Sequence, residues 1–270
     1  MGHVKAIPNI PAAPGKTIAA IFLLPNCDMG CTFCASDLGF DRMSFEQACN
    51  LIQALSNAGY HNVVLGGGEP ALWRDGDKNL ADVAHFAKGL GLTVQVNTNG
   101  IRLPQNFAQL DHVDRFIFPM DGASATKHDS LRVILGAKPS GHFDLVQRRV
   151  AECIEAGKQI TIGTVLNAAN YHEITELVAW MRARLSDGAN IHAWHLYRFQ
   201  AVGRGGASTG DTLSLSEPQF RAACDEAKAS NLPISIWRRD DMLNSSTVEF
   251  FWYEGGLLQV GSEAWAPAPS

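Results

Sequence analysis

Strand-like apolar runs alternate with helix-like segments along most of this chain, and this alternation restricts its fold more than any other feature. The runs are bounded by glycine, proline, asparagine or charged residues, and they occupy residues 17–25, 62–65, 92–96, 114–119, 159–167 and a stretch within 190–199. Short apolar strands separated by helices predict a parallel sheet with crossover helices. This pattern fits a partial barrel and also an open doubly wound sheet. In either fold the active site is expected at the carboxyl edge of the strands.

The helices are signalled by caps and by apolar residues at helical spacing. Ser44 and Gln47 form a capping box before an apolar face that includes Cys49. Further helices are expected near residues 78–89 and 142–156 and after Asn170, which we expect to act as a cap. Cys49, Cys153 and Cys224 each fall on an apolar helix face, so we interpret all three as core residues.

Three cysteines stand directly after the first apolar run, at a C-x3-C-x2-C spacing. They are Cys27, Cys31 and Cys34. A tight loop with this spacing can turn three sulfurs towards iron or zinc, for which thiolates are suitable ligands. Structural zinc sites and electron-carrying iron-sulfur clusters usually have four protein ligands, so a set of three leaves one metal position open. An open position predicts chemistry at the metal.

This spacing resembles the radical S-adenosylmethionine (SAM) superfamily, whose loop binds a 4Fe-4S cluster through three cysteines. In that family SAM chelates the fourth iron, and an electron splits SAM into methionine and a 5′-deoxyadenosyl radical that abstracts hydrogen from a substrate. The resemblance implies that Cys27, Cys31 and Cys34 are the cluster ligands and that Phe33 lies beside the cofactors. It also implies an α/β fold, a partial (β/α)6 TIM-type barrel with a short C-terminal α+β closing segment.

A second motif supports the resemblance one strand later. Gly67, Gly68 and Glu69, followed by proline, match the family's GGEP sequence, which receives the amino group of SAM. The resemblance implies further SAM contacts on or after later strands, at Asn97, Asn99, Asp121, Arg132, Thr164 and Leu196. Among these, Arg132 is expected to bind the SAM carboxylate. Taken singly, the asparagines and Asp121 also suit turns, and Arg132 also suits a solvated surface.

Substrate residues are expected on the last barrel strand and in the C-terminal segment. The candidates are His195, Tyr197, Arg198, Arg204, Trp237, Arg238, Arg239, Trp252 and Tyr253. Arginine and aromatic side chains suit a flat or anionic substrate. The alternative is that the aromatic residues only seal the barrel.

The composition of the chain bears on its binding partners and on its location in the cell. The chain has 270 residues, 46% of them apolar, and a net charge of -5, which gives no general attraction for nucleic acid. It has neither an apolar run long enough to span a membrane nor a signal-peptide pattern, so we expect no membrane association and a cytoplasmic location. We divide the chain into an extended lead-in (1–16), a barrel core (17–206), a closing segment (207–263) and a tail (264–270).

The sequence therefore predicts an oxygen-sensitive radical SAM enzyme with one 4Fe-4S cluster. Because the sequence has no second cysteine cluster, we favour a small-molecule or nucleotide substrate. We expect an electron donor such as flavodoxin or ferredoxin. A second enzymatic interpretation is the maturation of a ribosomally made peptide or the activation of a partner protein. The non-enzymatic alternative is an iron-sulfur electron carrier or a zinc-binding module.

Overall fold

The computed structural model describes residue 10 and residues 15–36, 39–242 and 245–261. Of the expected lead-in, only residues 10, 15 and 16 are among the described residues, and the expected tail lies outside them.

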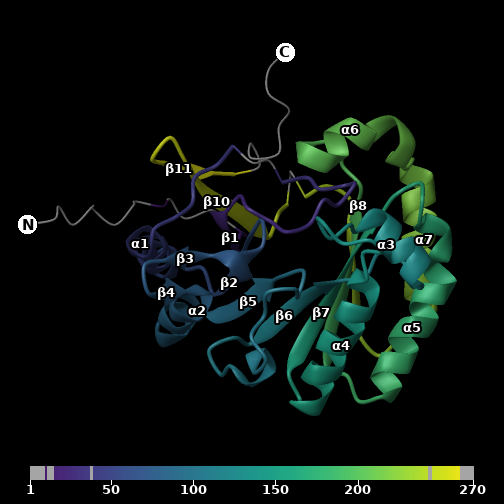
Figure 1. Cartoon of the computed structure of the whole chain (residues 1–270), viewed down its shortest axis with the longest axis horizontal. Helices are drawn as coiled ribbons and strands as arrows, with labels where there is room; N and C mark the ends of the chain where they lie inside the picture. Colours follow the sequence, from purple (N-terminus) through teal and green to yellow (C-terminus); the bar gives the residue numbers. More distant parts are fainter. Residues whose placement is uncertain (1–9, 11–14, 37–38, 243–244, 262–270) are drawn as a thin grey trace, which may run out of the picture.

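A nine-stranded sheet forms the centre of the molecule, in the order β11-β10-β1-β2-β5-β6-β7-β8-β9 (Figure 1). The six predicted strands are confirmed as its parallel core: β1 (Ile18–Leu24), β2 (Asn62–Gly67), β5 (Thr93–Asn97), β6 (Arg115–Pro119), β7 (Gln159–Leu166) and β8 (Ile191–Arg198). Their carboxyl ends therefore lie at one edge of the sheet, where the cysteine loop and the other strand-exit loops meet.

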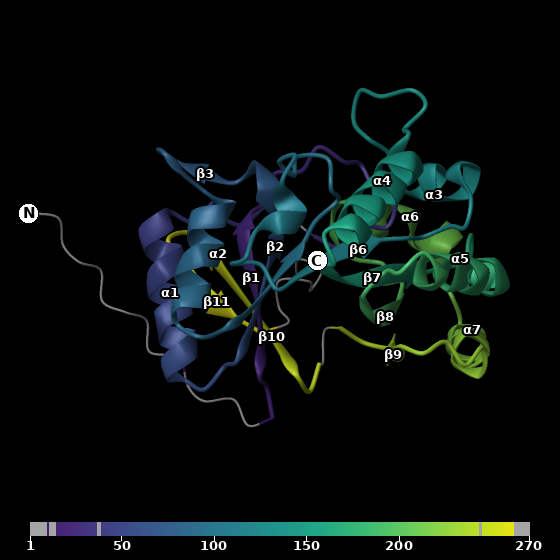
Figure 2. The same cartoon turned by 90° about the horizontal axis from the view of Figure 1, so that it is seen from below.

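Helices cover the outer face of this sheet (Figures 1 and 2). They are α1 (Phe45–Asn57), α2 (Leu80–Gly89), α3 (Ala125–Leu131), α4 (His142–Glu155), α5 (Ile174–Ser186) and α7 (Glu217–Ala229). Helix α6 (Gly203–Leu213) lies instead at the carboxyl edge, with its start against the cysteine loop (Figure 1). The capping box of α1 is present, since the Gln47 backbone N–H donates to Ser44 Oγ at 3.1 Å and Gln47 Oε1 accepts from the Ser44 N–H at 2.8 Å. Asn170 lies at the N-cap position of the short 3-10 turn Tyr171–Glu173 that leads into α5, as predicted, but its side chain makes no capping hydrogen bond. The side chain instead accepts from the Asn167 N–H and donates to the carbonyls of Asp121 and Val165.

Strand β1 is apolar along its whole length because both of its faces are buried. Ile21 and Leu23 are fully buried on the side that packs against the helices, whereas Ala20 and Phe22 line an internal cavity. Both faces of the strand are therefore covered, as in parallel sheets generally. Burying a leucine or isoleucine side chain stabilises the fold by about 1.5–3 kcal/mol.

The C-terminal strands extend the sheet at both edges. β9 (Ser235–Arg239) pairs parallel to β8, and β10 (Val248–Glu254) pairs parallel to β1 and carries the antiparallel β11 (Leu257–Val260). No pairing among the described strands joins β9 to β10 or β11, so the barrel is partial, as predicted. The short strands β3 (Arg74–Asp75) and β4 (Lys78–Asn79) form a separate ribbon. Helix α6 runs across residue 206, so the division between core and closing segment stays a prediction.

Candidate active site

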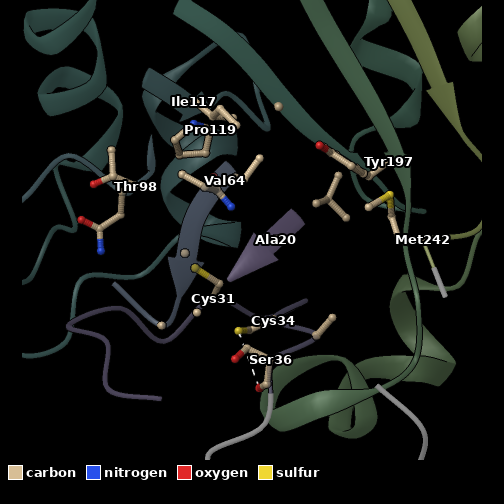
Figure 3. Close-up of a pocket in the computed structure, with 18 of the residues that line it drawn as sticks. Ala20, Cys31, Cys34, Ser36, Val64, Thr98, Ile117, Pro119, Tyr197 and Met242 are labelled. Carbon is tan, nitrogen blue, oxygen red and sulfur yellow. Dashed lines mark hydrogen bonds between the residues drawn. The ribbon is translucent and has the colours of Figure 1, made fainter. Parts of the chain in front are cut away.

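A cavity of about 370 Å³ lies inside the partial barrel, beside the carboxyl ends of the strands. The three cysteines of the loop after β1 line it, together with residues from eight of the sheet strands. In Figure 3 Cys31 and Cys34 lie on one side of this cavity, and Tyr197 and Met242 lie on another. The volume falls within the range of pockets that hold small molecules.

Backbone hydrogen bonds hold the cysteine loop in place. The N–H of Gly30 donates to the Val133 carbonyl at 2.8 Å, and the N–H of Thr32 donates to the Leu131 carbonyl at 3.1 Å. An isolated antiparallel bridge also joins Met29 to Ile134. The loop is therefore paired with the segment that follows α3, and its conformation does not depend on the loop residues alone.

Nitrogen donors surround the sulfurs. Asn99 Nδ2 lies 3.7 Å from Cys27 Sγ, and Arg132 Nη1 lies 3.8 Å from Cys31 Sγ. Burial raises the pKa of Cys31 to about 11, although Arg132 opposes the shift, and burial likewise raises the pKa of Cys27. Without metal both thiols are therefore protonated at neutral pH, and metal binding must release their protons.

The GGEP segment lies against the start of the cysteine loop. A Cβ at Gly68 would lie 2.1 Å from the Asn26 carbonyl oxygen, so only glycine fits this approach. Glu69 is buried, and its carboxylate accepts from Thr98 Oγ1 at 2.7 Å, the Asn99 N–H at 2.7 Å and the Ala71 N–H at 3.0 Å. Burial raises the pKa of Glu69 to about 7, although the three hydrogen bonds act to lower it. The motif thus joins the loops that follow β1, β2 and β5.

Asn97 and Asn99 both line the cavity, but they differ in their contacts. Asn97 is exposed at the end of β5, whereas Asn99 is buried and donates to Asp28 Oδ1 at 2.8 Å. Asn99 Oδ1 also accepts from the Ile101 N–H at 2.9 Å, so the predicted Asx turn is present. Gly67, Gly68, Glu69, Phe33 and Arg132 line the cavity as well. Their contacts with SAM stay predictions.

Asp121 does not line the cavity. Its side chain is fully buried, Oδ2 accepts from Arg132 Nε at 2.5 Å, and Oδ1 accepts from the Val165 N–H at 2.6 Å. Both carboxylate oxygens therefore have internal partners, and the SAM contact predicted for this residue has no support in the geometry.

Two buried histidines link the loops after β6 and β5. His128 Nδ1 accepts from the Asp121 N–H at 3.1 Å, and His128 Nε2 lies 2.8 Å from His142 Nδ1. His142 Nε2 lies 2.9 Å from the Asn99 carbonyl oxygen, which can only accept a hydrogen bond. This series of hydrogen bonds therefore requires the proton to be on Nε2 in both imidazole rings. Burial lowers the pKa of both rings, to about 4 for His142, so both are neutral at neutral pH. The sequence analysis did not identify this pair.

Thr164 and Leu196 point away from the cavity, so the structure does not support their predicted contacts with SAM. Thr164 Oγ1 donates to the Met120 carbonyl at 2.6 Å and accepts from Trp194 Nε1 at 2.9 Å, and Leu196 is in the core. Side chains alternate along a strand, and the cavity is lined instead by Gly163, Val165, His195 and Tyr197. The prediction selected the correct strands but the wrong face.

Only some of the residues predicted to contact the substrate lie at the cavity. His195, Tyr197, Arg198, Arg204 and Arg239 line the cavity, whereas Trp237, Arg238, Trp252 and Tyr253 are not among its lining residues. Trp237 is half exposed, and Trp252 and Tyr253 are buried in β10.

The donor set suits an iron-sulfur cluster that opens into the cavity. Three thiols line one side, and the buried Arg204 Nε beside them has no acceptor in the described part of the chain. The described residues include no group of three or more His, Cys, Asp or Glu side chains placed to hold a single metal ion. A cubane cluster requires no such convergence, because each cysteine binds a different iron.

A comparison with protein families decides the assignment: the model of the radical SAM superfamily matches residues 21–181, which include the cysteine loop, the GGEP segment and the strands β2 to β7. The chain belongs to the radical SAM superfamily. The cofactors of this radical SAM protein are therefore a 4Fe-4S cluster and SAM, which together supply the hydrogen-abstracting radical chemistry. Cys27, Cys31 and Cys34 are the residues that would hold the cluster.

Relatives of this radical SAM protein act on different substrates. It is 24% identical over 229 residues to an AdoMet-dependent heme synthase of Oleidesulfovibrio alaskensis, covering 80% of this chain and 55% of that one. It is 29% identical over 207 residues to the mycofactocin maturase MftC of Mycolicibacterium smegmatis, covering 74% and 48%. The chain thus spans about half the length of these curated relatives.

A solved structure shares the fold. Streptococcus suis SuiB bound to its precursor peptide SuiA superposes with a TM-score of 0.67 over 93% of this chain and 60% of that chain, at 14% identity. At this identity the likeness shows the fold alone. The residues that the structure describes include no helix with the length and apolar character needed to cross a bilayer.

Proposed function

We propose that this radical SAM enzyme abstracts hydrogen from a small molecule or nucleotide that carries an anionic group, held against Arg239. The proposal rests on the positive charge of the side chains that line the cavity. Four arginines line the cavity, at positions 132, 198, 204 and 239, whereas Glu69 is the one carboxylate among the described lining residues. Glu69 already accepts three hydrogen bonds, so the wall favours a negatively charged occupant.

Arg239 differs from the other three arginines in having no protein acceptor among the described contacts. Arg132 pairs with Asp121, Arg198 donates to the Leu215 carbonyl, and Arg204 donates to the Met29 carbonyl. The Arg239 guanidinium lies 5.7 Å from the centre of the Trp237 ring and is in none of the described ion pairs. A guanidinium of this kind suits bidentate binding of a carboxylate or phosphate.

His195 and Tyr197 supply neutral hydrogen-bonding groups beside Arg239. Tyr197 is the strand-pairing partner of Arg239, and its hydroxyl lies 3.1 Å from His195 Nδ1. Burial, with Arg239 nearby, lowers the pKa of His195 to about 3, so the ring is uncharged at neutral pH. Other parts of the wall are apolar, including Ala20 and Phe250. These features support a substrate with an apolar or flat body as well as an anionic group.

A peptide substrate is the second candidate. It is favoured by the likeness to SuiB, whose structure was solved with its precursor peptide, and by the relative MftC, a maturase. The heme synthase relative favours the small-molecule proposal. We also propose flavodoxin or ferredoxin as the electron donor and the cytoplasm as the location.

The proposal is tested by anaerobic reconstitution with iron and sulfide, followed by dithionite, SAM and candidate substrates. The substrate panel comprises nucleoside triphosphates, a tetrapyrrole carboxylate and short peptides. We expect an anionic small molecule to stimulate 5′-deoxyadenosine formation and deuterium to pass from the labelled substrate into that product. Stimulation by peptides alone would overturn the proposal in favour of the second candidate.

Arg239→Gln tests the assigned contact, and Arg238→Gln is its matched control. Arg238 is the adjacent residue, bonds Asp240 at 3.1 Å and is not among the cavity-lining residues. We expect Arg239→Gln to raise the KM for the anionic substrate about tenfold or more, because loss of a charged hydrogen bond costs about 1.5–3 kcal/mol. Equal KM values for the two variants would contradict the role of Arg239.

A further inference from the structure

The start of α6 lies against the cysteine loop at two glycines that leave no room for a side chain. A Cβ at Gly205 would be 2.3 Å from the Cys31 carbonyl oxygen and 2.7 Å from the Cys34 nitrogen. At Gly203, where φ is +71°, a Cβ would be 2.1 Å from the Ala35 carbonyl oxygen. The Gly205 N–H also donates to the Cys34 carbonyl at 3.0 Å. The helix is thus held directly on the backbone of the cysteine loop.

Arg204 stands between these glycines, so its backbone position is determined by the same contacts. Its N–H donates to the Ser36 carbonyl at 3.2 Å, and its Nη2 donates to the Met29 carbonyl at 3.3 Å. One acceptor lies between Cys27 and Cys31 in the sequence, and the other follows Cys34. The Arg204 side chain therefore lies across the loop that carries them.

Arg204 lines the same cavity as Cys27 and Cys34, and its guanidinium lies near both sulfurs. Burial tends to lower the pKa of Arg204, but its neighbours Cys34 and Cys27 raise it above its ordinary value. Its Nε is buried and has no hydrogen-bond acceptor among the residues that the structure describes. Buried N–H groups almost always have a partner, so an unsatisfied one beside the cavity points to an acceptor that the metal centre would supply.

The three sulfurs consequently have different neighbours. Cys31 has Arg132 at 3.8 Å, and Cys27 has Asn99 at 3.7 Å, whereas Arg204 lies near both Cys27 and Cys34. Reduction adds negative charge to a cluster already bound by thiolates. A nearby cation or N–H donor stabilises the reduced form more than the oxidised form, which raises the reduction potential.

We infer that Arg204 is a positioning residue of the metal centre: α6 holds its guanidinium beside Cys27 and Cys34, where its charge makes the cluster easier to reduce. This role rests on the family's cluster and not on the proposed substrate. It also gives a function to the glycine-rich start of α6, where the sequence analysis named Arg204 only as a substrate candidate.

The experiment compares Arg204→Gln, Arg204→Lys and Arg221→Gln in the full chain. Arg221→Gln is the control, because it removes the same charge from a half-exposed ion pair with Glu217 on α7. Each protein is reconstituted with iron and sulfide. Iron content, circular dichroism of the metal-free form and the midpoint potential from an EPR-monitored titration are then measured without SAM or substrate.

We expect Arg204→Gln to have a more negative midpoint potential than wild type and Arg221→Gln, with an unchanged fold. Arg204→Lys should keep most of the wild-type value, since it retains the charge. A wild-type potential in Arg204→Gln, or equal shifts in the Gln and Lys variants, would overturn the inference. If Arg204→Gln folds but retains little iron, Arg204→Lys decides: recovered iron with a near wild-type potential supports the inference, and iron loss as severe as in the Gln variant contradicts it.

Discussion

Arg132 forms a buried ion pair with Asp121, with 2.5 Å between Arg132 Nε and Asp121 Oδ2. The same guanidinium lies 3.8 Å from Cys31 Sγ and 5.0 Å from the centre of the Phe33 ring. Since Asp121 also accepts from the Val165 N–H, the pair links the ends of β6 and β7 to the cysteine loop. The residue predicted to bind SAM directly therefore also supports the wall of the site.

Asp121→Asn should destabilise the metal-free protein by about 3–5 kcal/mol, because it leaves the buried Arg132 charge unpaired. The measurement is urea unfolding followed by circular dichroism. Arg221→Gln, which breaks a pair with both side chains half exposed, should change the free energy of unfolding by less than about 1 kcal/mol. Similar values for the two variants would show that the buried pair contributes little.

Cys31→Ala should abolish both cluster binding and SAM cleavage, because it removes one of the three thiolates that line the cavity. Cys153→Ala should leave both intact and destabilise the fold by about 1 kcal/mol, since Cys153 is a buried core residue of α4. Iron content after reconstitution and 5′-deoxyadenosine formation are the two measurements. SAM cleavage retained by Cys31→Ala would contradict the ligand assignment.

Gly205→Ala should reduce iron content several-fold, because its Cβ would overlap the Cys31 carbonyl at 2.3 Å and displace either the loop or α6. Gly89→Ala is the matched control: it lies in α2 and its Cβ would meet nothing within 4 Å. Helix propensity predicts that Gly89→Ala is neutral or stabilising by up to about 1 kcal/mol. Equal iron content in the two variants would show that the close approach is not required.

Glu69 should give the metal-free protein a pH dependence that Glu69→Gln lacks. Burial raises its pKa from 4.5 to about 7, so between these values the folded state binds the proton more tightly than the unfolded chain. The free energy of unfolding of wild type should therefore fall, relative to Glu69→Gln, as pH rises from about 4.5 to about 7, and then level off. Urea unfolding at several pH values measures this difference. A difference that is constant with pH would mean that the pKa of Glu69 is not raised.

The motifs of the site were predictable because their geometry is local. The cysteine spacing and the GGEP segment each lie within eight residues, directly after an apolar strand, and the cavity contains both. The boundaries of the parallel strands were predictable to within a few residues for the same reason.

The sequence alone determined the alternation of strands and helices, the cysteine set and the family, since each depends on spacing along the chain. Only the tertiary structure decided which face of a strand meets the cavity. It turned Thr164 and Leu196 outward and His195 and Tyr197 inward, because helices cover one face of the sheet and the cavity lies on the other. It also decided that the glycine-rich segment at Gly203 forms a helix, since contacts with the cysteine loop outweigh the poor helix propensity of glycine.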